Sequence, residues 1–394
     1  MANQNNARKI MGHLFEEMAE ILETGKKSGK MKIGLTIHGC ETSINSWVKA
    51  AENTTFQSSD FEVVLIGPRQ KTDLLQFDAV NEEQAHRKME TMLDHGIIDA
   101  CITTHYTYPI GVASVGKMTT LGHGRQIYLA TTSGTSAINR GAAMTLNALY
   151  GIIVAKTMGN ENPTVGILNV EGARQVEKAL IQLNERGYPI RFAESMRSES
   201  GCIMRGNDII AGTPDILVQD SLTGNITMKM CASFMSGGSV ETVGAGYGPG
   251  IGELYERIAM VISRASGEQV VENAIQFAAH LVRGRLVKIA KKEFRTARKA
   301  GLTEILDRMY MNNNGSKKIQ EVATPLGEPV THGITGIDIM DVEYAVQTLW
   351  KNGIYAESGM GCTGPVLLVS EKNLEKGIEK LRQSGYLVYE EKEC

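Results

Sequence analysis

Short runs of apolar, β-branched residues alternate along the chain with longer stretches in which apolar positions recur every three to four residues. The first pattern is typical of buried strands and the second of helices that pack through one face. Strands are expected at 31–37, 61–66, 97–103, 126–131, 164–168, 190–193 and 215–219. Helices are expected at 8–24, 44–51, 82–94, 109–118, 136–157, 174–185 and 268–298. This alternation predicts a mainly parallel sheet covered by helices on both faces, and ligands bind such sheets beyond the carboxyl ends of the strands.

The C-terminal part of the chain forms a second, smaller pattern. The polar run Asn312-Asn-Asn-Gly-Ser-Lys317 is the strongest candidate for a linker. After it, helices are expected at 338–350 and 373–383, and strands at 353–356, 366–369 and 386–389. We therefore predict a main α/β domain over residues 1–312 and a small α/β unit over residues 317–394 that presents a loop around Cys362.

Cys362 lies in the glycine-rich stretch Glu357-Ser-Gly-Met-Gly-Cys-Thr-Gly-Pro365, between two apolar runs. Glycine allows the backbone to approach a ligand closely, and buried structural cysteines usually lie inside strands or helices. We therefore expect Cys362 to be an exposed, reactive thiol. The amides of Gly361, Thr363 and Gly364 are the expected donors to an oxyanion. A free thiol on a tight turn, without a role, is the simpler alternative.

A second candidate site lies where the strand at 215–219 ends at Asp220 and a helix is expected to begin near Asn225. Backbone N–H groups at a helix N-terminus suit an oxyanion or a phosphate. The residues predicted to form this anion site are Asp220, Thr223, Gly224, Asn225 and Lys229. A helix that is simply capped by Thr223 or Asn225 is the alternative.

The charge balance excludes several classes of function. The formal net charge is -3 and 42% of residues are hydrophobic, which fits an ordinary globular protein and gives no electrostatic case for binding nucleic acid or an anionic membrane. No apolar run is long enough to span a bilayer, and the polar start Met1–Asn6 is not expected to be a signal peptide. Six cysteines without a CxxC motif indicate reduced thiols in a cytoplasm.

The remaining cysteines are expected to do little. Cys101 lies in an expected strand and Cys231 in an expected helix, so both are predicted to be buried in the core. Cys40 has His38 and Glu41 beside it, but it lacks a second pair of ligands at useful spacing, so no metal site is expected.

Two further stretches leave alternatives open. Residues 236–252 are rich in glycine but lack the strand-then-helix frame of a dinucleotide loop, so we expect a mobile lid or hinge. The basic run from Arg283 to Arg298 is either a solvated helix face or a docking face for an acidic partner.

The middle of the chain resembles the phosphate:acyl-carrier-protein acyltransferases over roughly residues 30–300. The resemblance rests on Asn207-Asp208, Gly212, Asp215, Asp220 and Thr223-Gly-Asn225 with Lys229 on the following helix. It implies a three-layer α/β sandwich like that of the isocitrate dehydrogenase and phosphate acyltransferase group, and transfer of an acyl group from a thioester to inorganic phosphate. The chain departs from this family in Thr36-Ile-His-Gly-Cys-Glu41, where the family has an acidic double-glycine motif, and in the added unit that carries Cys362.

The whole chain, including the Gly-Met-Gly-Cys362-Thr-Gly-Pro segment, resembles the family of alpha subunits of component C of the glycine/sarcosine/betaine reductase complex. This resemblance implies that Cys362 carries an acetyl group, that inorganic phosphate attacks it as a substrate, and that no cofactor is bound. The implied partners are the component C beta subunit and selenoprotein A carrying a carboxymethyl-selenocysteine, in the cytoplasm of an anaerobe that ferments amino acids. We also expect a homo-oligomer or hetero-oligomer. His332 or His38 is the expected base that activates the thiol.

Two other functions stay open at this point. The chain could be a phosphate acyltransferase or phosphotransacetylase that uses acyl carrier protein or coenzyme A thioesters, with Cys362 incidental. It could also be a non-catalytic scaffold that docks a partner through the basic 283–298 helix.

Overall fold

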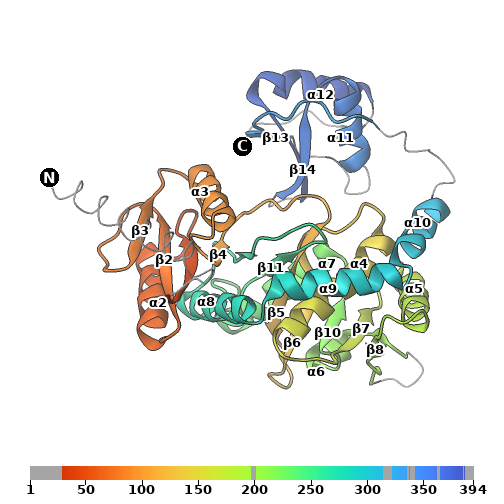
Figure 1. Cartoon of the computed structure of the whole chain (residues 1–394), viewed down its shortest axis with the longest axis horizontal. Helices are drawn as coiled ribbons and strands as arrows, with labels where there is room; N and C mark the ends of the chain where they lie inside the picture. The colour runs from red at the N-terminus through yellow and green to blue at the C-terminus, as the bar shows by residue number, and fades with distance from the viewer. Residues whose placement is uncertain are drawn as a thin grey trace, which may run out of the picture.

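The computed structural model describes residues 29–196, 201–313, 322–334, 337, 342–361, 364–384 and 386. These residues form a twelve-stranded sheet with helices on both faces and a separate three-stranded sheet (Figure 1). The strand order of the large sheet is β3-β2-β1-β4-β12-β11-β5-β6-β10-β7-β8, and β9 pairs with β7. The predicted three-layer α/β fold with a mostly parallel sheet is therefore confirmed.

One half of the large sheet is entirely parallel. Its strands are β1 (Met31–Thr36), β2 (Phe61–Gly67), β3 (Leu75–Asp78), β4 (Ala100–Thr103) and β12 (Ala259–Val261). The central strands are buried along almost their whole length, as expected of parallel strands that helices cover on both faces.

The other half contains the antiparallel strands. Its strands are β5 (Val112–Thr119), β6 (Gln126–Thr135), β7 (Thr164–Leu168), β8 (Arg191–Phe192), β9 (Ile203–Met204), β10 (Ile216–Val218) and β11 (Gly248–Ile251). β5 is antiparallel to both β6 and β11, and β11 is antiparallel to β12. The helix predicted at 109–118 is therefore wrong. Its apolar residues are buried as a strand in the middle of the sheet.

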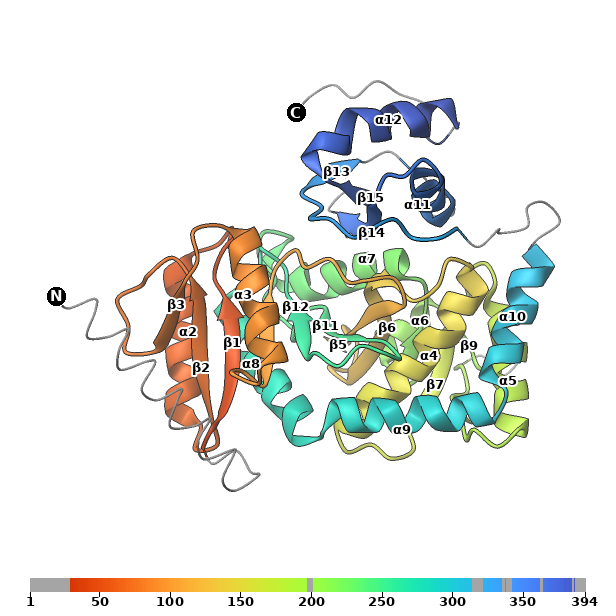
Figure 2. The same ribbon diagram turned by 45° about the horizontal axis from the view of Figure 1, so that its top comes forward.

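Two layers of helices enclose the sheet (Figure 2). One face carries α2 (Ile44–Gln57), α4 (Arg140–Thr157), α5 (Ala173–Glu185), α8 (Glu268–Arg283), α9 (Leu286–Lys299) and α10 (Leu302–Asn313), which share one hydrophobic core. The opposite face carries α3 (Glu82–Asp94), α6 (Gly206–Ala211) and α7 (Ser221–Ser233), followed by the short 3-10 helix Phe234–Ser236. The long helix predicted at 136–157 is confirmed as α4.

Two predicted elements near the centre of the chain need correction. The glycine-rich stretch predicted as a lid contains β11, whose four residues are buried inside the sheet. The single helix predicted at 268–298 is divided into α8 and α9 at Gly284 and Arg285. Arg285 has a positive φ of 57°. A Cβ at Gly284 would lie 2.1 Å from the carbonyl oxygen of Thr157, so the close packing of α4 requires glycine there.

The C-terminal residues form a small sheet with its own hydrophobic core. Its strands are β13 (His332–Ile334), β14 (Ala356–Gly361) and β15 (Gly364–Val369), in the order β13-β15-β14. Helices α11 (Val342–Lys351) and α12 (Leu374–Gln383), with the 3-10 turn Glu371–Asn373 before α12, cover it. The boundaries predicted for the two domains stay a prediction, and the strand expected at 386–389 lies largely outside the described residues.

Candidate functional site

Three helices begin together at the carboxyl edge of the parallel strands β6, β10 and β7. Each strand leads directly into its own helix, α4, α7 and α5 respectively. Arg140, the first residue of α4, contacts residues at the starts of the other two helices. Its Nη2 lies 2.9 Å from Oδ2 of Asp220, and its Nη1 lies 3.5 Å from Oε2 of Glu171, one residue before the cap of α5. Converging helix N-termini with a cation between them favour an anion at this edge.

The start of α7 differs in detail from the expected one. The helix begins at Ser221, not near Asn225, and its N-cap is Asp220, whose carboxylate accepts hydrogen bonds from the N–H of Thr223 (3.0 Å) and from its hydroxyl (2.7 Å). The cap is therefore neither Thr223 nor Asn225. No described residue accepts a hydrogen bond from the N–H groups of Ser221 and Leu222, so these donors are available to a ligand.

Asp220 is held in its charged form. Burial alone would raise its pKa, but the hydrogen bonds from Thr223 and the guanidinium of Arg140 outweigh burial, and the pKa of Asp220 is lowered. Because its oxygens already accept hydrogen bonds, the Asp220 carboxylate orients Arg140 and leaves the N–H groups of Ser221 and Leu222 available.

Gly224 and Asn225 fix α7 against the end of β6. A Cβ at Gly224 would lie 1.7 Å from the carbonyl oxygen of Thr131, so only glycine fits there. The side-chain amide of Asn225 donates to the carbonyl of Thr132 at 3.1 Å. Both residues therefore position the helix that Asp220 caps, and the binding of an anion by Asp220, Thr223, Gly224 and Asn225 stays a prediction.

Buried polar atoms without a partner lie under this helix start. Both side-chain polar atoms of Gln219 and the hydroxyl of Thr131 are buried and have no hydrogen-bond partner among the described residues. Such groups are costly unless a ligand or water satisfies them, so they also favour a polar ligand near this edge.

Lys229 projects from α7 toward a second polar cluster. Its side chain is exposed, and its charge influences the pKa values of both His105 and Glu241. The pKa of His105 is lowered, first by burial and then by the charge of Arg264, while Glu82 opposes the shift.

Arg264 is a candidate ligand-binding residue that the sequence reasoning missed. It follows β12, and its Nη2 lies 2.9 Å from Oε2 of Glu82, whose other oxygen accepts from the hydroxyl of Thr104 at 3.0 Å. Its Nε is buried and has no partner among the described residues. The signal that could have found it is a cation directly after a strand, but β12 itself was not predicted.

Glu241 is a second residue that the sequence reasoning missed. It is 4% exposed, and its Oε1 accepts from the hydroxyl of Tyr247 at 3.0 Å, while its Oε2 has no partner among the described residues. Burial raises the pKa of Glu241. The glycine-rich sequence around Glu241 did not predict that its side chain is buried.

The strands β14 and β15, which precede and follow the predicted thiol in the sequence, form an antiparallel pair. The strands pair from Ala356 with Val369 to Gly361 with Gly364. Cys362 and Thr363, between the last pair, lie outside the described residues. A Cβ at Gly359 would lie 2.4 Å from Thr107, so β14 packs against the segment that follows β4. Figures 1 and 2 both place β14 on the side of the small unit that faces the large sheet.

The two histidines proposed as bases lie apart. His332 pairs with Val369, at the end of β15 opposite the turn, which is about 16 Å from Gly364 at the usual rise of a strand. A side chain at this position is too distant to reach the turn. His38 follows β1, and its Nε2 lies 2.8 Å from the carbonyl oxygen of Ala79.

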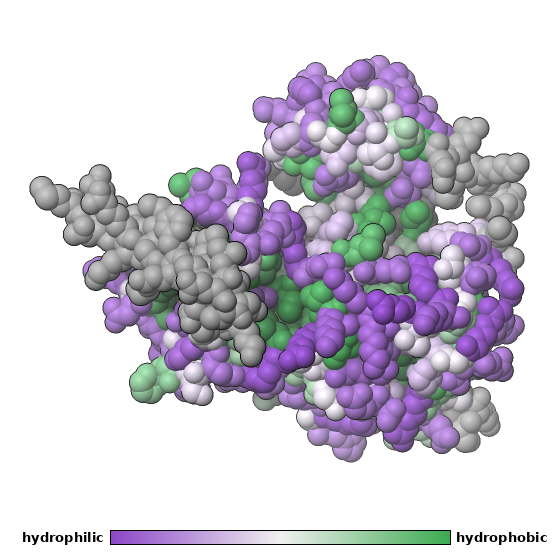
Figure 3. Space-filling model, in the orientation of Figure 1, coloured by the Kyte–Doolittle hydropathy of each residue, from purple (hydrophilic) through white to green (hydrophobic). Residues whose placement is uncertain are grey.

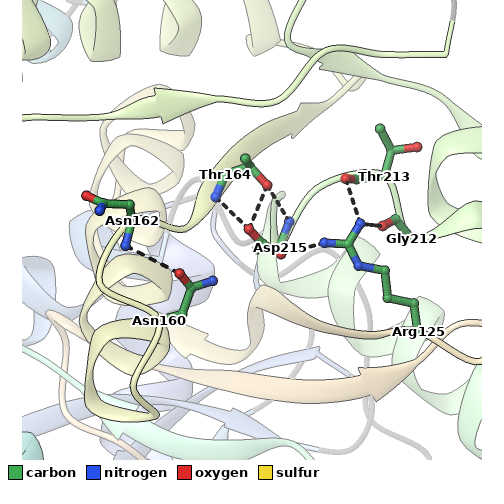
Figure 4. Close-up of polar contacts among 7 residues, drawn as sticks. All are labelled: Arg125, Asn160, Asn162, Thr164, Gly212, Thr213 and Asp215. Atoms are coloured by element: carbon green, nitrogen blue, oxygen red, sulfur yellow. Dashed lines mark hydrogen bonds and ion pairs between the residues drawn. The ribbon is translucent and has the colours of Figure 1, made fainter.

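Other residues of the acyltransferase-like signature lie at the opposite edge of the sheet. Oδ2 of Asp215 accepts from the N–H and hydroxyl of Thr164 at 2.8 and 2.9 Å, and Nη2 of Arg125 lies 2.6 Å from Oδ1 (Figure 4). Arg125 also donates to the carbonyl of Gly212 at 2.8 Å. Asp215 therefore joins strand starts, whereas Asp220 lies at the carboxyl edge of the strands.

The cysteines in the described part of the chain are packed or bonded. Cys101 and Cys231 are buried, as predicted, and burial raises both pKa values. The thiol of Cys202 donates to Oε1 of Glu177 at 3.3 Å, and burial, followed by this hydrogen bond, raises its pKa to about 12. Among the described residues, no group of three or more His, Cys, Asp and Glu side chains could hold a metal ion.

A cavity of about 520 Å³ lies on the other side of the sheet from α7, between α4, α9 and α10. Its walls include Tyr150, Phe294 and the ion pair of Arg298 with Glu253. Figure 3 shows apolar surface above α9 on this face.

The basic run from Arg283 to Arg298 is partly paired with acidic residues, since Arg283 contacts Asp60 and Lys291 lies 2.6 Å from Glu256. No helix in the described ranges is both long and apolar enough to cross a membrane.

Comparison with known proteins identifies relatives of this chain. The family model described as "Fatty acid synthesis protein" matches residues 31–368. The glycine/sarcosine/betaine reductase complex component C subunit alpha of Peptoclostridium acidaminophilum is 49% identical over 381 residues, which cover 97% of this chain and 99% of that protein. A phosphate acyltransferase of Thermotoga maritima is 26% identical over 233 residues, covering 50% of this chain and 68% of that protein.

Among solved structures, a branched-chain phosphotransacylase from Enterococcus faecalis is similar with a TM-score of 0.45 and 14% identity, over 64% of this chain and 99% of that one. The family match spans most of the chain, and the similarity to the reductase subunit runs along almost its entire length. The chain therefore belongs to the family described as "Fatty acid synthesis protein", and to the family of component C alpha subunits of glycine/sarcosine/betaine reductase complexes.

Proposed function

We propose that this chain transfers an acetyl group from a thioester to inorganic phosphate, as a subunit of a glycine/sarcosine/betaine reductase complex. The observation that carries the proposal is the position of Arg140, which meets Asp220 and Glu171 where three helices begin. A dianion such as phosphate gains from each helix N-terminus and from a fixed guanidinium. The similarity to a phosphate acyltransferase of Thermotoga maritima supports the same reaction class.

Phosphate would bind beside the start of α7. The N–H groups of Ser221 and Leu222, which have no partner among the described residues, and the guanidinium of Arg140 are the donors at this helix start, and Lys229 is a cation about two turns further along α7. Asp220, Thr223, Gly224 and Asn225 then position these donors, since their own polar groups are bonded within the protein or packed on β6. No bound cofactor is needed for this step.

Cys362 would carry the acetyl group. A phosphate oxygen attacks the carbonyl carbon of the thioester, the new C–O bond forms, and the C–S bond breaks. The electron pair leaves with the cysteine sulfur, which then takes the proton that phosphate loses. Amides of Gly361, Thr363 and Gly364 would stabilise the oxyanion of the tetrahedral intermediate. Contact of β14 with the segment after β4 supports a hairpin that works against the carboxyl edge of the large sheet.

The partners follow from the same family. The relative from Peptoclostridium acidaminophilum is named as subunit alpha of component C of a reductase complex. We infer that this chain likewise works with a component C beta subunit in a cytoplasm. The acetyl group would originate from selenoprotein A carrying a carboxymethyl-selenocysteine.

The test is arsenate-dependent breakdown of acetyl phosphate by the purified chain, with and without its partner subunit. Cys362→Ala and Cys362→Ser should abolish turnover, and the wild-type peptide that contains Cys362 should gain an acetyl group when the protein is mixed with acetyl phosphate. Cys40→Ser is the matched control, since Cys40 is a half-buried thiol bonded to Thr42 at 3.3 Å, and it should retain activity. Full activity of both Cys362 variants would refute the role given to that thiol.

The second candidate is a phosphate acyltransferase that uses acyl carrier protein or coenzyme A thioesters directly. The similarity to phosphate acyltransferases favours it. Under this reading the Cys362 variants stay active, and acetyl-coenzyme A or acetyl-acyl carrier protein is turned over without any selenoprotein. Measuring both substrates with the same variants separates the two functions.

A further inference from the structure

Helix α9 and the turn before it expose cations alone. All eight exposed side chains between residues 283 and 299 belong to lysine or arginine, although the chain as a whole has a net charge of -3. The one acidic residue of α9, Glu293, is 4% exposed and is bound in the core to Lys156 and Tyr188. A helix that only faces solvent usually mixes charges of both signs. Solubility alone therefore does not explain this face.

These cations form two groups. Arg283, Lys291 and Arg298 each have an acidic partner elsewhere in this chain. The other group has no acidic partner among the described residues, and we call it the α9 stripe. Its members are Arg285, Lys288, Lys292, Arg295 and Lys299. The chain therefore neutralises one side of the basic run and leaves the stripe charged.

The stripe repels itself along one line of the helix. Residues three and four positions apart are neighbours on a helix surface, and like charges at this spacing are destabilising. From Lys288 to Lys299 the cations are spaced by four, three and four residues, over about 16 Å at the usual helical rise. An acidic surface that lies along this line would replace the repulsion by attraction.

The backbone at Arg285 is a second, independent observation. Its φ of 57° lies in the left-handed region, which residues other than glycine, asparagine and aspartate seldom adopt. Glycine would fit this corner between α8 and α9 more easily, yet the position holds an arginine with an exposed side chain that extends the stripe. A cation kept at a strained position indicates a use for its charge.

The helix presents the stripe rigidly. The opposite side of α9 is buried in the main core through Leu286, Ala290, Phe294 and Ala297. Figure 2 shows α9 on the side of the molecule opposite the small C-terminal sheet. A partner can therefore lie along the stripe without displacing β14 and β15, and a surface that is already ordered loses less entropy on binding.

We propose that the α9 stripe is the docking surface for an acidic face of the component C beta subunit. The identity of this partner rests on the proposed function, whereas the surface itself is assigned from its charge. The exposed positions of α9 include no apolar side chain that could enter a bilayer, and the negative net charge of the whole chain opposes anionic lipid and nucleic acid. A single row of cations fits a row of carboxylates on a folded protein.

The first experiment is isothermal titration calorimetry of the full chain with the purified beta subunit. The triple variant Lys288→Glu/Lys292→Glu/Arg295→Glu should raise the dissociation constant on the order of 100-fold, because three attractive contacts become repulsive. Raising the salt concentration should weaken binding of the wild type more than binding of this variant. Circular dichroism checks that the variant folds.

The matched control is the triple variant Lys30→Glu/Lys71→Glu/Lys178→Glu. It changes the net charge by the same amount at exposed positions of other segments, and its dissociation constant should stay within about threefold of wild type, since charges far from the contact are screened. Equal losses in the two triple variants would assign the effect to net charge and overturn the stripe as a docking surface.

The second experiment is zero-length carbodiimide cross-linking of the two subunits, which joins a lysine amine to a carboxylate in contact with it. Mass spectrometry should find Lys288, Lys292 or Lys299 joined to Asp or Glu of the beta subunit. Cross-links from these lysines only to carboxylates of this chain would overturn the proposal. Phosphatidylserine vesicles test the lipid alternative, and a stripe variant that loses vesicle binding but keeps its affinity for the beta subunit would overturn it as well.

Failure of the docking surface and failure of the proposed reaction give different results. Binding is measured without acetyl phosphate, and Cys362→Ala should bind the beta subunit as tightly as wild type. A wild-type chain that does not bind the beta subunit, or a stripe variant that binds it with unchanged affinity, overturns the docking surface whatever the arsenolysis assay gives. Docking that depends on the stripe in a chain without acyl transfer supports the surface and contradicts only the proposed reaction.

Discussion

Nη2 of Arg140 lies 2.9 Å from Oδ2 of Asp220, so the first residue of one helix is bound to the N-cap of another. The guanidinium also reaches Glu171 beside the cap of a third helix. Its Nε is buried without a partner among the described residues. Arg140 therefore has a fixed orientation and a spare donor at the edge where an anion is expected.

Replacing Arg140 by alanine should weaken the use of phosphate. The variant keeps the free amides of α7 but loses the charge that holds the dianion, so kcat/KM for phosphate should fall on the order of 100-fold. Arg140→Lys should recover part of this loss. Steady-state arsenolysis of acetyl phosphate measures it. Arg174→Ala is the control, since Arg174 is exposed and, among the described residues, pairs with Glu177 alone. An Arg140→Ala enzyme within twofold of wild type would contradict the anion site.

Gly224→Ala should destabilise the protein. The added methyl group would lie 1.7 Å from the carbonyl oxygen of Thr131, so α7 would have to move off β6, at about 3 kcal/mol. A thermal midpoint several degrees lower is the expected result. Gly206→Ala is the matched control, because Gly206 is also in the first half of a helix and nothing lies within 4 Å of its Cβ position. Equal thermal midpoints for the two variants would show that the close approach of Gly224 to Thr131 does not limit stability.

Asp215→Asn should cost stability in a pH-dependent way. Burial would raise the pKa of Asp215, but hydrogen bonds from Thr164 and the charge of Arg125 outweigh it and lower that pKa below its ordinary value of 3.8. The folded state therefore favours the carboxylate above pH 3.8, and this contribution disappears as pH falls through the lower folded-state pKa.

Thermal unfolding of wild type and Asp215→Asn at several pH values checks this prediction. The difference in unfolding free energy should be about 1–3 kcal/mol at pH 7 and shrink below about pH 4. The KM for phosphate should not change, since Asp215 precedes β10 and Asp220 follows it, at the opposite edge of the sheet. A difference that persists unchanged in acid would argue against the charged hydrogen bonds as its cause.

Lys156→Met should destabilise the core between α4 and α9. Nζ of Lys156 lies 2.8 Å from Oε2 of Glu293, which is 4% exposed and also accepts from the hydroxyl of Tyr188 at 2.8 Å. Removing the lysine leaves a buried carboxylate without its cation, at about 3 kcal/mol. Lys291→Met breaks only the exposed pair with Glu256 and should change stability by less than about 0.5 kcal/mol. Denaturant unfolding compares the two variants.

Much of the fold could be predicted from residue patterns. The strands β1, β2, β4, β6, β7 and β10 and the long helix α4 have strong apolar patterns, so their existence followed from local sequence, whereas the short parallel strands β3 and β12 were not predicted. β5 could not be recognised, because an apolar run such as Val112–Met118 fits a buried strand or a helix equally well. Its antiparallel pairing with β11 depends on residues more than a hundred positions away, which local patterns do not report.

The candidate site was predictable in part for the same reason. The Asp220–Asn225 turn has a local signature of small and polar residues after a strand. Arg140, Arg264 and Glu241 become candidates only through contacts with distant segments, and Glu241 gains its burial from the strand pairing around it. His332 seemed a reasonable base in sequence, yet strand register places it opposite Val369.

The three residues of β10 impose a constraint on chain length. Asp215, just before β10, accepts a hydrogen bond from Thr164 at the start of β7, and Asp220, just after β10, caps α7. Inserting or deleting a single residue between them would turn the intervening side chains to opposite faces and pull one carboxylate out of place. Loop lengths elsewhere in the molecule can vary without this penalty. The spacing between these two aspartates is therefore a more stringent marker of an intact site in related chains than the identity of any single residue.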